Sequence, residues 1–165
     1  MRSTRVIPRI GVVLVTGFLF VALTGGAALA SSVHFKKGSP TFTDNGVTLT
    51  ASGALTGLGN GDVFISLDAT GNPTATCTNK GGNEAPGQNP AAVNVSGGEA
   101  IPASEIKNGN LSFNVTTEPP AQPTAAEAGC PSANWTAAIT DIDFTSATIT
   151  VEQGGVVVLT KTFTL

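Results

Sequence analysis

The apolar residues of this chain recur with a period of two, and this spacing constrains the fold more than any other feature. The runs 63–68 (VFISLD) and 111–116 (LSFNVT) each place an apolar residue at every second position. Such spacing points one set of side chains of a β-strand toward a core and the other toward solvent. Glycine, proline and Asn-Gly pairs separate the runs, and almost no stretch has the spacing of an amphipathic helix. The pattern predicts an all-β protein.

Many short strands separated by turns are typical of two packed antiparallel sheets. No repeat of fixed period is present, which argues against a β-solenoid. We therefore expect an immunoglobulin-like antiparallel β-sandwich of about seven to nine strands, with Greek-key topology favoured over a barrel. Besides 63–68 and 111–116, strands are predicted near 33–37, 41–43, 46–52, 91–96 and within 134–164.

The parity of the apolar residues changes twice in the C-terminal third. Apolar residues lie at odd positions up to 139, at even positions 142 and 144, and at odd positions again from 147. A slip of one residue exchanges the two faces of a strand. The chain is therefore predicted to bulge or turn near Thr140-Asp141 and again near Ser146.

A hairpin is predicted at the glycine pair 154–155. A three-residue loop over 153–155 is favoured over a two-residue Gly-Gly loop, because it keeps apolar residues opposite one another. Lys161 then falls on the apolar face, where we expect it at a sheet edge or with its charge extended into solvent. The predicted pairs are Val151–Val157, Ile149–Leu159 and Thr148–Thr160.

Turn residues mark the remaining connections. Asn108-Gly109 is typical of a tight turn before the strand that begins at Leu111. The segment 101–106 fits either an edge strand or one helical turn. The stretches 78–90 and 118–132 are rich in Gly, Pro and Ala without periodicity, and they are predicted to be loops.

The N-terminus has the organisation of a secretory signal peptide. Three arginines precede an apolar run over 10–23, and Ala28-Leu29-Ala30 follows it. The apolar run is shorter than the roughly 20 residues of a membrane-spanning helix. We expect cleavage after Ala30, which leaves one β-sandwich domain over 31–165; an uncleaved N-terminal anchor is the alternative.

Without residues 1–30 the chain is acidic. It keeps five lysines, no arginine and eleven carboxylates, which is a formal net charge of −6. An acidic surface without arginine is poorly suited to phosphate backbones or anionic membranes. We therefore expect no nucleic-acid partner and, after cleavage, no membrane span.

Cys77 and Cys130 both lie in the predicted exported part. Export places them in an oxidising compartment, where a single Cys77–Cys130 disulfide is expected. Two free thiols or an intermolecular pair are the alternatives. Because each long loop begins or ends at a cysteine, the disulfide is predicted to tie the two loops together at one end of the domain.

Catalytic chemistry has few candidates in this sequence. The one histidine, His34, lies close to the predicted new N-terminus, and both sulfurs are expected to be oxidised. We expect no enzymatic activity and no cofactor. Asp141 and Asp143 would share one strand face and could contribute to a Ca²⁺ site, but no dense loop of oxygen ligands accompanies them, and a solvated strand face is the favoured interpretation.

Threonine recurs at alternate positions in several predicted strands. Aligned threonine ladders could form a flat surface that binds ice or a polymer, whereas ordinary strand propensity explains the same residues without a ligand. The pairs and triplet are Thr41/Thr43, Thr48/Thr50, Thr74/Thr76, Thr148/Thr150 and Thr160/Thr162/Thr164.

The densest polar side chains lie in the two predicted loops. Loops held by a rigid sandwich commonly carry binding residues, so we expect the interaction surface at the disulfide end; solvated loop tips are the alternative. The candidates are Asn79, Lys80, Asn83, Glu84, Gln88, Asn89, Glu118, Gln122 and Glu127.

Three strings carry a resemblance. The segments GLGNGDVFISLDATGNPTATCTNKGGNEAPGQNPA (57–91), IPASEIKNGN (101–110) and NWTAAITDIDFTSATITV (134–151) resemble a family of small exported bacterial β-proteins of unknown function. The part over 77–90 is the most specific. The resemblance implies bacterial export and assigns no catalytic residue.

These observations lead to an expected function of limited detail. We expect a secreted, non-catalytic module that binds an extracellular or cell-surface partner. A structural or self-assembling protein of the cell envelope is the alternative, suggested by the threonine pattern and the β-rich C-terminal hairpin.

Overall fold

The computed structural model describes residues 32–88 and 90–165, so the predicted signal peptide lies outside the described residues. The described part contains nine β-strands and one short 3₁₀ helix, which confirms the all-β prediction. The elements are β1 (His34–Phe35), β2 (Thr41–Asp44), β3 (Leu49–Thr56), β4 (Val63–Thr78), β5 (Glu84–Pro86), β6 (Val93–Ile101), η1 (Ala103–Glu105), β7 (Leu111–Thr116), β8 (Thr136–Gln153) and β9 (Val156–Thr164).

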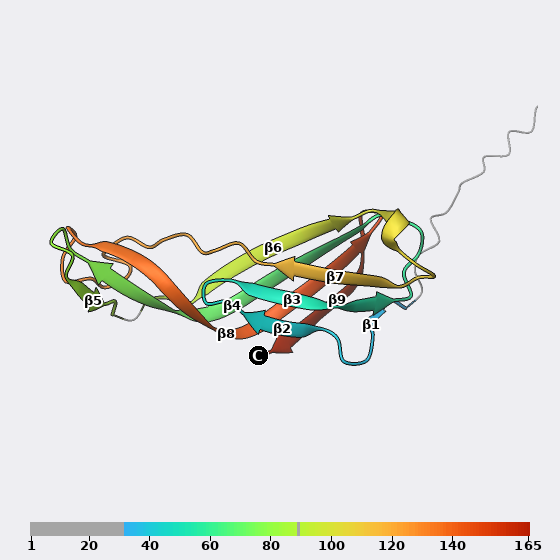
Figure 1. Cartoon of the computed structure of the whole chain (residues 1–165), viewed down its shortest axis with the longest axis horizontal. Helices are drawn as coiled ribbons and strands as arrows, with labels where there is room; N and C mark the ends of the chain where they lie inside the picture. The colour runs from blue at the N-terminus through green and yellow to red at the C-terminus, as the bar shows by residue number, and fades with distance from the viewer. Residues whose placement is uncertain (1–31, 89) are drawn as a thin grey trace, which may run out of the picture.

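The strands form two antiparallel sheets. In the four-stranded sheet A, β3 pairs with β1 and β2 along one side and with β7 along the other. In the five-stranded sheet B, β4 and β8 are central, β5 and β6 pair along the outer side of β4, and β9 pairs with β8. Figure 1 shows that β4 and β8 extend well beyond the part of sheet B that lies against sheet A.

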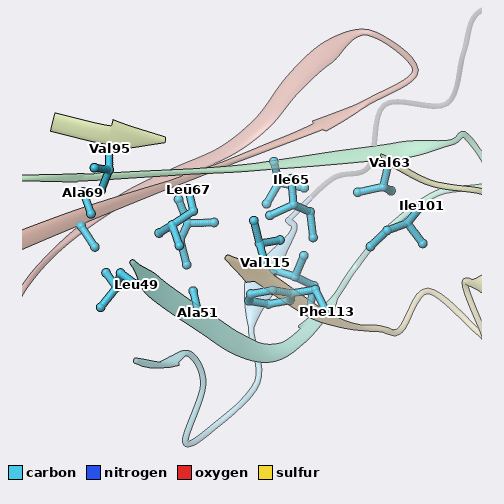
Figure 2. Packing of buried hydrophobic residues seen from close by; sticks show 14 of the residues in the cluster. Leu49, Ala51, Val63, Ile65, Leu67, Ala69, Val95, Ile101, Phe113 and Val115 are labelled. Carbon is cyan, nitrogen blue, oxygen red and sulfur yellow. The ribbon is translucent and has the colours of Figure 1, made fainter. Parts of the chain in front are cut away.

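Apolar side chains of both sheets fill the space between them (Figure 2). Ile65 and Leu67 of β4 are fully buried, as are Ala51 of β3 and, nearly so, Val115 of β7. The predicted core-facing sides of 63–68 and 111–116 are thus confirmed. Each fully buried leucine or isoleucine contributes about 1.5–3 kcal/mol relative to exposure.

The backbones of the two sheets come into contact where β6 lies beside β7. The backbone N–H of Glu118, just after β7, donates to the carbonyl oxygen of Ser96 in β6 (2.8 Å). A Cβ atom at Gly97 would overlap the carbonyl oxygen of Thr116. Glycine is therefore required at position 97 because the backbone of the other sheet occupies the space of a side chain.

Two bulges in β8 confirm the predicted changes of parity. Ser146 pairs with Thr70 and Phe144 with Gly71, so Thr145 has no partner opposite it. At the second bulge, Asp141 pairs with Thr74 and Ile139 with Ala75, so Thr140 has no partner on β4. Each extra residue exchanges the faces of the strand, which turns Ile139, Ile142, Phe144 and Ala147 all toward the interior.

The predicted three-residue hairpin loop is wrong. Gly154 and Gly155 alone form the loop, both with positive φ (59° and 79°), and Gln153 pairs with Val156. A two-residue turn of this conformation matches the right-handed twist of the strands. A bulge then places Val151 opposite Leu159, so the predicted pairs Val151–Val157, Ile149–Leu159 and Thr148–Thr160 are replaced by Val151–Leu159, Ile149–Lys161 and Thr148–Thr162.

Several strand boundaries differ from the prediction. The third strand starts at Leu49 because residues 45–48 form a turn, in which Asp44 Oδ1 accepts the N–H of Gly46 (2.8 Å). β4 continues to Thr78, and the small residues Gly71, Pro73 and Ala75 are buried at alternate positions, a pattern that apolar periodicity does not detect. The predicted loop 78–90 also contains a strand, β5.

The connection between β6 and β7 resolves the alternative left open for 101–106. Ile101 ends β6, and residues 103–105 form one 3₁₀ turn. Asn108 and Gly109, with φ of 51° and 74°, form the predicted tight turn, and Lys107 pairs with Asn110 across it.

Candidate functional site

The part of sheet B beyond the first bulge forms an arm, which we define as 72–78 of β4, β5 and 136–143 of β8. It projects from the sandwich at the left of Figure 1. Few apolar residues are buried in it: Ala75, Cys77, Ile139 and Ile142 on the strands, with Ala128 on the adjacent connection 117–135, and both isoleucines belong to the core cluster between the sheets. The arm therefore has little core of its own.

A disulfide joins Cys77 and Cys130, as predicted. Cys77 is fully buried in β4, one residue before the strand ends, and Cys130 lies in the connection 117–135 between β7 and β8. The bond thus ties this connection to a strand, whereas the expectation was a tie between two loops. It closes a loop with a sequence separation of 53 residues.

Hydrogen bonds also hold the connection 117–135 against the arm. Gln122 Oε1 accepts the backbone N–H of Ile139 (2.7 Å), next to the bulge at Thr140. The carbonyl oxygen of Ala128 accepts the N–H of Gln88 (2.8 Å). The candidate Gln122 therefore satisfies a backbone N–H in the part of β8 that does not pair with β9.

Glu127 has a structural partner. Its Oε2 accepts hydrogen bonds from the backbone N–H and the hydroxyl of Thr124, both at 2.8 Å, and Thr124 Oγ1 accepts the N–H of Glu127 (3.3 Å). This reciprocal arrangement is a capping box at the turn that leads to Cys130. The hydrogen bond from the Thr124 backbone lowers the pKa of Glu127, and the bond from its hydroxyl adds to the effect.

We expect Glu127→Gln to loosen this turn at neutral pH. The pKa of Glu127 is lower in the folded protein than in the unfolded chain. The carboxylate therefore stabilises the fold at pH values above its unfolded pKa, about 4.3. This stabilisation disappears as the pH falls through the folded pKa. Amide hydrogen exchange at Ala128 and Cys130 should be faster in the variant at neutral pH and equal to the wild type in acid. Glu84→Gln, which removes the same charge elsewhere on the arm, is the control; equal exchange in both variants at neutral pH contradicts the assignment.

The tip of the arm is the tight hairpin between β4 and β5. Asn79 Oδ1 accepts the backbone N–H of Gly81 (2.9 Å) and of Asn83 (3.0 Å), so Asn79 orders the turn. The side chains of Lys80, Asn83 and Glu84 are exposed around it. These three are the candidates with exposed polar side chains at the tip, and Asn83 Nδ2 also donates to Asn79 Oδ1 (3.4 Å).

The remaining candidates lie elsewhere. Gln88 is exposed after β5, and its Nε2 donates to the carbonyl oxygen of Pro86 (3.3 Å). Glu118 follows β7 beside β6, in the sandwich and not on the arm. Asn89 lies outside the described residues. The structure thus divides the predicted set among the tip, the flank of the arm and the sandwich.

A groove of about 380 Å³ runs along the flank of the arm. Its polar groups are Gln122 and Glu127; its walls are proline, alanine and branched apolar side chains. Sequence reasoning missed it because these small residues carry no polar or periodic signal. The wall residues are Pro73, Pro90, Ala91, Ala92, Val93, Ala121, Pro123 and Ile139.

The other sequence candidates remain on the surface. Asp141 and Asp143 are both exposed on β8, and no group of three or more His, Cys, Asp or Glu residues in the described chain is placed to hold a metal ion. His34 Nδ1 lies 2.7 Å from the carbonyl oxygen of Ser32. The hydroxyls of Thr148 and Thr162 are hydrogen-bonded across β8 and β9 (2.8 Å).

No helix in the described ranges is long and apolar enough to cross a membrane. Comparison with known proteins adds no relative: no protein-family model and no curated protein sequence matches this chain.

Proposed function

We propose that this protein is a secreted, non-catalytic binding module of the bacterial cell exterior, in which the sandwich presents the arm to an extracellular or cell-surface partner. One observation carries the proposal: the arm is held by a disulfide and by side-chain hydrogen bonds although it buries few apolar residues. Most of the core between the sheets lies in the sandwich, and only Ile139 and Ile142 of the arm belong to it. A rigid projection with exposed polar residues is suited to recognition.

The strand order supports an immunoglobulin-like topology for this module. The order β2-β3-β7 of sheet A corresponds to strands A-B-E of an immunoglobulin domain. The order β6-β4-β8-β9 of sheet B corresponds to C′-C-F-G. Under this correspondence, the connections β4–β6 and β7–β8 fall at one end of the domain, and both contribute to the arm.

The tip of the arm is the first surface to test. We expect the variant Lys80→Ala/Asn83→Ala/Glu84→Ala to reduce capture of cell-envelope or culture-supernatant components by the immobilised protein about tenfold, which equals about 1.4 kcal/mol. The melting temperature should not change, because these side chains are exposed and Asn79, which orders the turn, is kept.

The variant Thr150→Ala/Thr160→Ala is the matched control. It alters a cross-strand pair of β8 and β9 outside the arm, since Thr150 pairs with Ser66 on β4. It should capture the same components as the wild type. Capture that is lost only in this control would move the binding surface to the threonine face of sheet B and contradict the proposed role of the arm.

A further inference from the structure

The strand β9 is a free edge of sheet B. Among the described residues it pairs only with β8, and it lies at the lower right of Figure 1. The opposite edge of the sheet is covered, because β6 lies against the backbone of β7 at Gly97. Among the described strands, β9 (9 residues) is therefore the long edge of sheet B that another strand can extend, and β5 (3 residues) is a second, short edge.

The backbone of β9 offers a regular series of hydrogen-bonding groups along this edge. The N–H of Leu165 donates to the carbonyl oxygen of Thr145 (3.1 Å), so residue 165 directs its groups toward β8. Direction alternates along an antiparallel strand. The N–H and C=O groups of Thr160, Thr162 and Thr164 therefore point away from β8, toward the free side.

Exposed apolar side chains gather on the same strand. Of the four large hydrophobic residues found exposed in the described chain, Val156 (49%), Val157 (55%) and Leu165 (44%) lie on or directly after β9. Phe163 is only partly buried, 5.2 Å from Phe42 between ring centroids. Apolar groups beside unpaired backbone are typical of an interaction edge.

We propose that β9 is a dimerisation edge, at which β9 of a second copy of this chain adds antiparallel about a two-fold axis through Thr162. The backbone N–H and C=O groups that point away from β8 can pair only if Thr160, Thr162 and Thr164 of one copy lie opposite the same three residues of the other copy. With the axis at Thr162, Thr162 faces Thr162 of the second copy and Thr160 faces Thr164. An axis at residue 161 would place two lysines opposite each other, which like-charge repulsion disfavours.

The side chains are self-complementary in this register. On the inner face, Lys161 lies opposite Phe163 of the second copy, and Lys161 already lies 5.2 Å from its own Phe163 ring centroid. Leu159 lies opposite the exposed Leu165. On the outer face, the threonine row through Thr148 and Thr162 continues across the axis. Cation–π and apolar contacts thus replace solvent contacts on both copies.

The geometry closes at two copies. The bulge at Val158 interrupts the edge before Leu159, and each copy uses its β9 edge in the pair, so this edge is not available to a third copy. The described residues carry a formal net charge of −6, so two copies repel each other at long range. Salt screens this repulsion, and we expect added NaCl to strengthen the dimer.

Cysteine cross-linking tests the pairing and its register together. In the proposed dimer, the Cα atoms of Thr162 and its symmetry mate are about 5.5 Å apart, a separation that a disulfide can bridge. The Thr160 pair is about 14 Å apart, because four residues separate them along the strand. Under mild oxidation at high protein concentration, Thr162→Cys should form covalent dimers and Thr160→Cys should not.

Two further variants separate backbone pairing from side-chain contact. Thr162→Pro removes an N–H that does not bond to β8, so it should abolish dimerisation, which sedimentation equilibrium measures. The β8–β9 hairpin should remain folded, which circular dichroism checks. Thr162→Ala keeps this N–H and should dimerise. A wild-type protein that stays monomeric over the whole concentration range, or equal cross-linking of Thr160→Cys and Thr162→Cys, overturns the proposal.

Discussion

Gly97→Ala is expected to destabilise this protein by about 3 kcal/mol, near the upper end of the range for overpacked sites. The added Cβ would overlap the carbonyl oxygen of Thr116 and approach Thr117 Cα (2.8 Å). Both belong to backbone held by β3, since Thr116 pairs with Thr50 and the N–H of Thr117 donates to Leu49. The neighbour cannot rotate away, and the two sheets must separate locally.

Gly98→Ala is the matched control for this expectation. Gly98 is the next residue of the same strand and faces the opposite side of sheet B, where its Cβ would meet the far end of the exposed Phe64 ring (2.6 Å). That ring can move at little cost, so the change in unfolding free energy should stay within about 0.5 kcal/mol. Urea denaturation followed by far-UV circular dichroism measures both. Similar values for the two variants would contradict a close backbone contact between β6 and β7 at Gly97.

Removal of the disulfide should have a comparable or larger effect, centred on the arm. For a sequence separation of 53 residues, loop-closure entropy gives a loss of about 4 kcal/mol. Cys77→Ala/Cys130→Ala is the suitable variant, because Cys77 is fully buried and a serine hydroxyl there would need a hydrogen-bond partner. The arm has few buried apolar residues to replace the covalent tie, whereas the core between the sheets is independent of it.

The expected result is therefore local as well as global. Hydrogen exchange and proteolysis should increase over 79–92 and 117–135, and the amides of β3 and β7 should keep their protection. Wild-type protein reduced and alkylated at both sulfurs should behave in the same way. Unchanged melting, or a uniform loss of protection in both sheets, would show that the disulfide does not stabilise the arm separately from the sandwich.

Prediction from sequence succeeded for features that depend on the alternation of apolar residues within a single strand. The alternation in 63–68 and 111–116 identified two core-facing strands, and the parity changes after Ile139 and Phe144 located both bulges of β8. The disulfide was predicted from the two cysteines and the expected export of the chain. The predicted register of the C-terminal hairpin was wrong. Matching of apolar residues favoured Val151 opposite Val157, whereas a bulge at Val158 places Val151 opposite Leu159, which is also an apolar pair.

The candidate site was predicted less well for a physical reason. A polar residue in a loop looks the same in sequence whether it binds a partner or its own backbone. Gln122 bonds to Ile139, Glu127 bonds to Thr124, and Asn79 orders its own turn, so these three have structural roles in the arm. Lys80, Asn83 and Glu84 keep their polar surface exposed.

The sequence by itself determined the strand class, the positions of the bulges and the pairing of the two cysteines, because each depends on side-chain periodicity or on the number of cysteines. Only the tertiary structure decided that β4 and β8 continue as an arm beyond the sandwich, that Gly97 must lack a side chain, and that β9 has a free edge. These properties depend on which backbone lies beside which, and contacts between residues far apart in the chain leave no periodic signal in either segment.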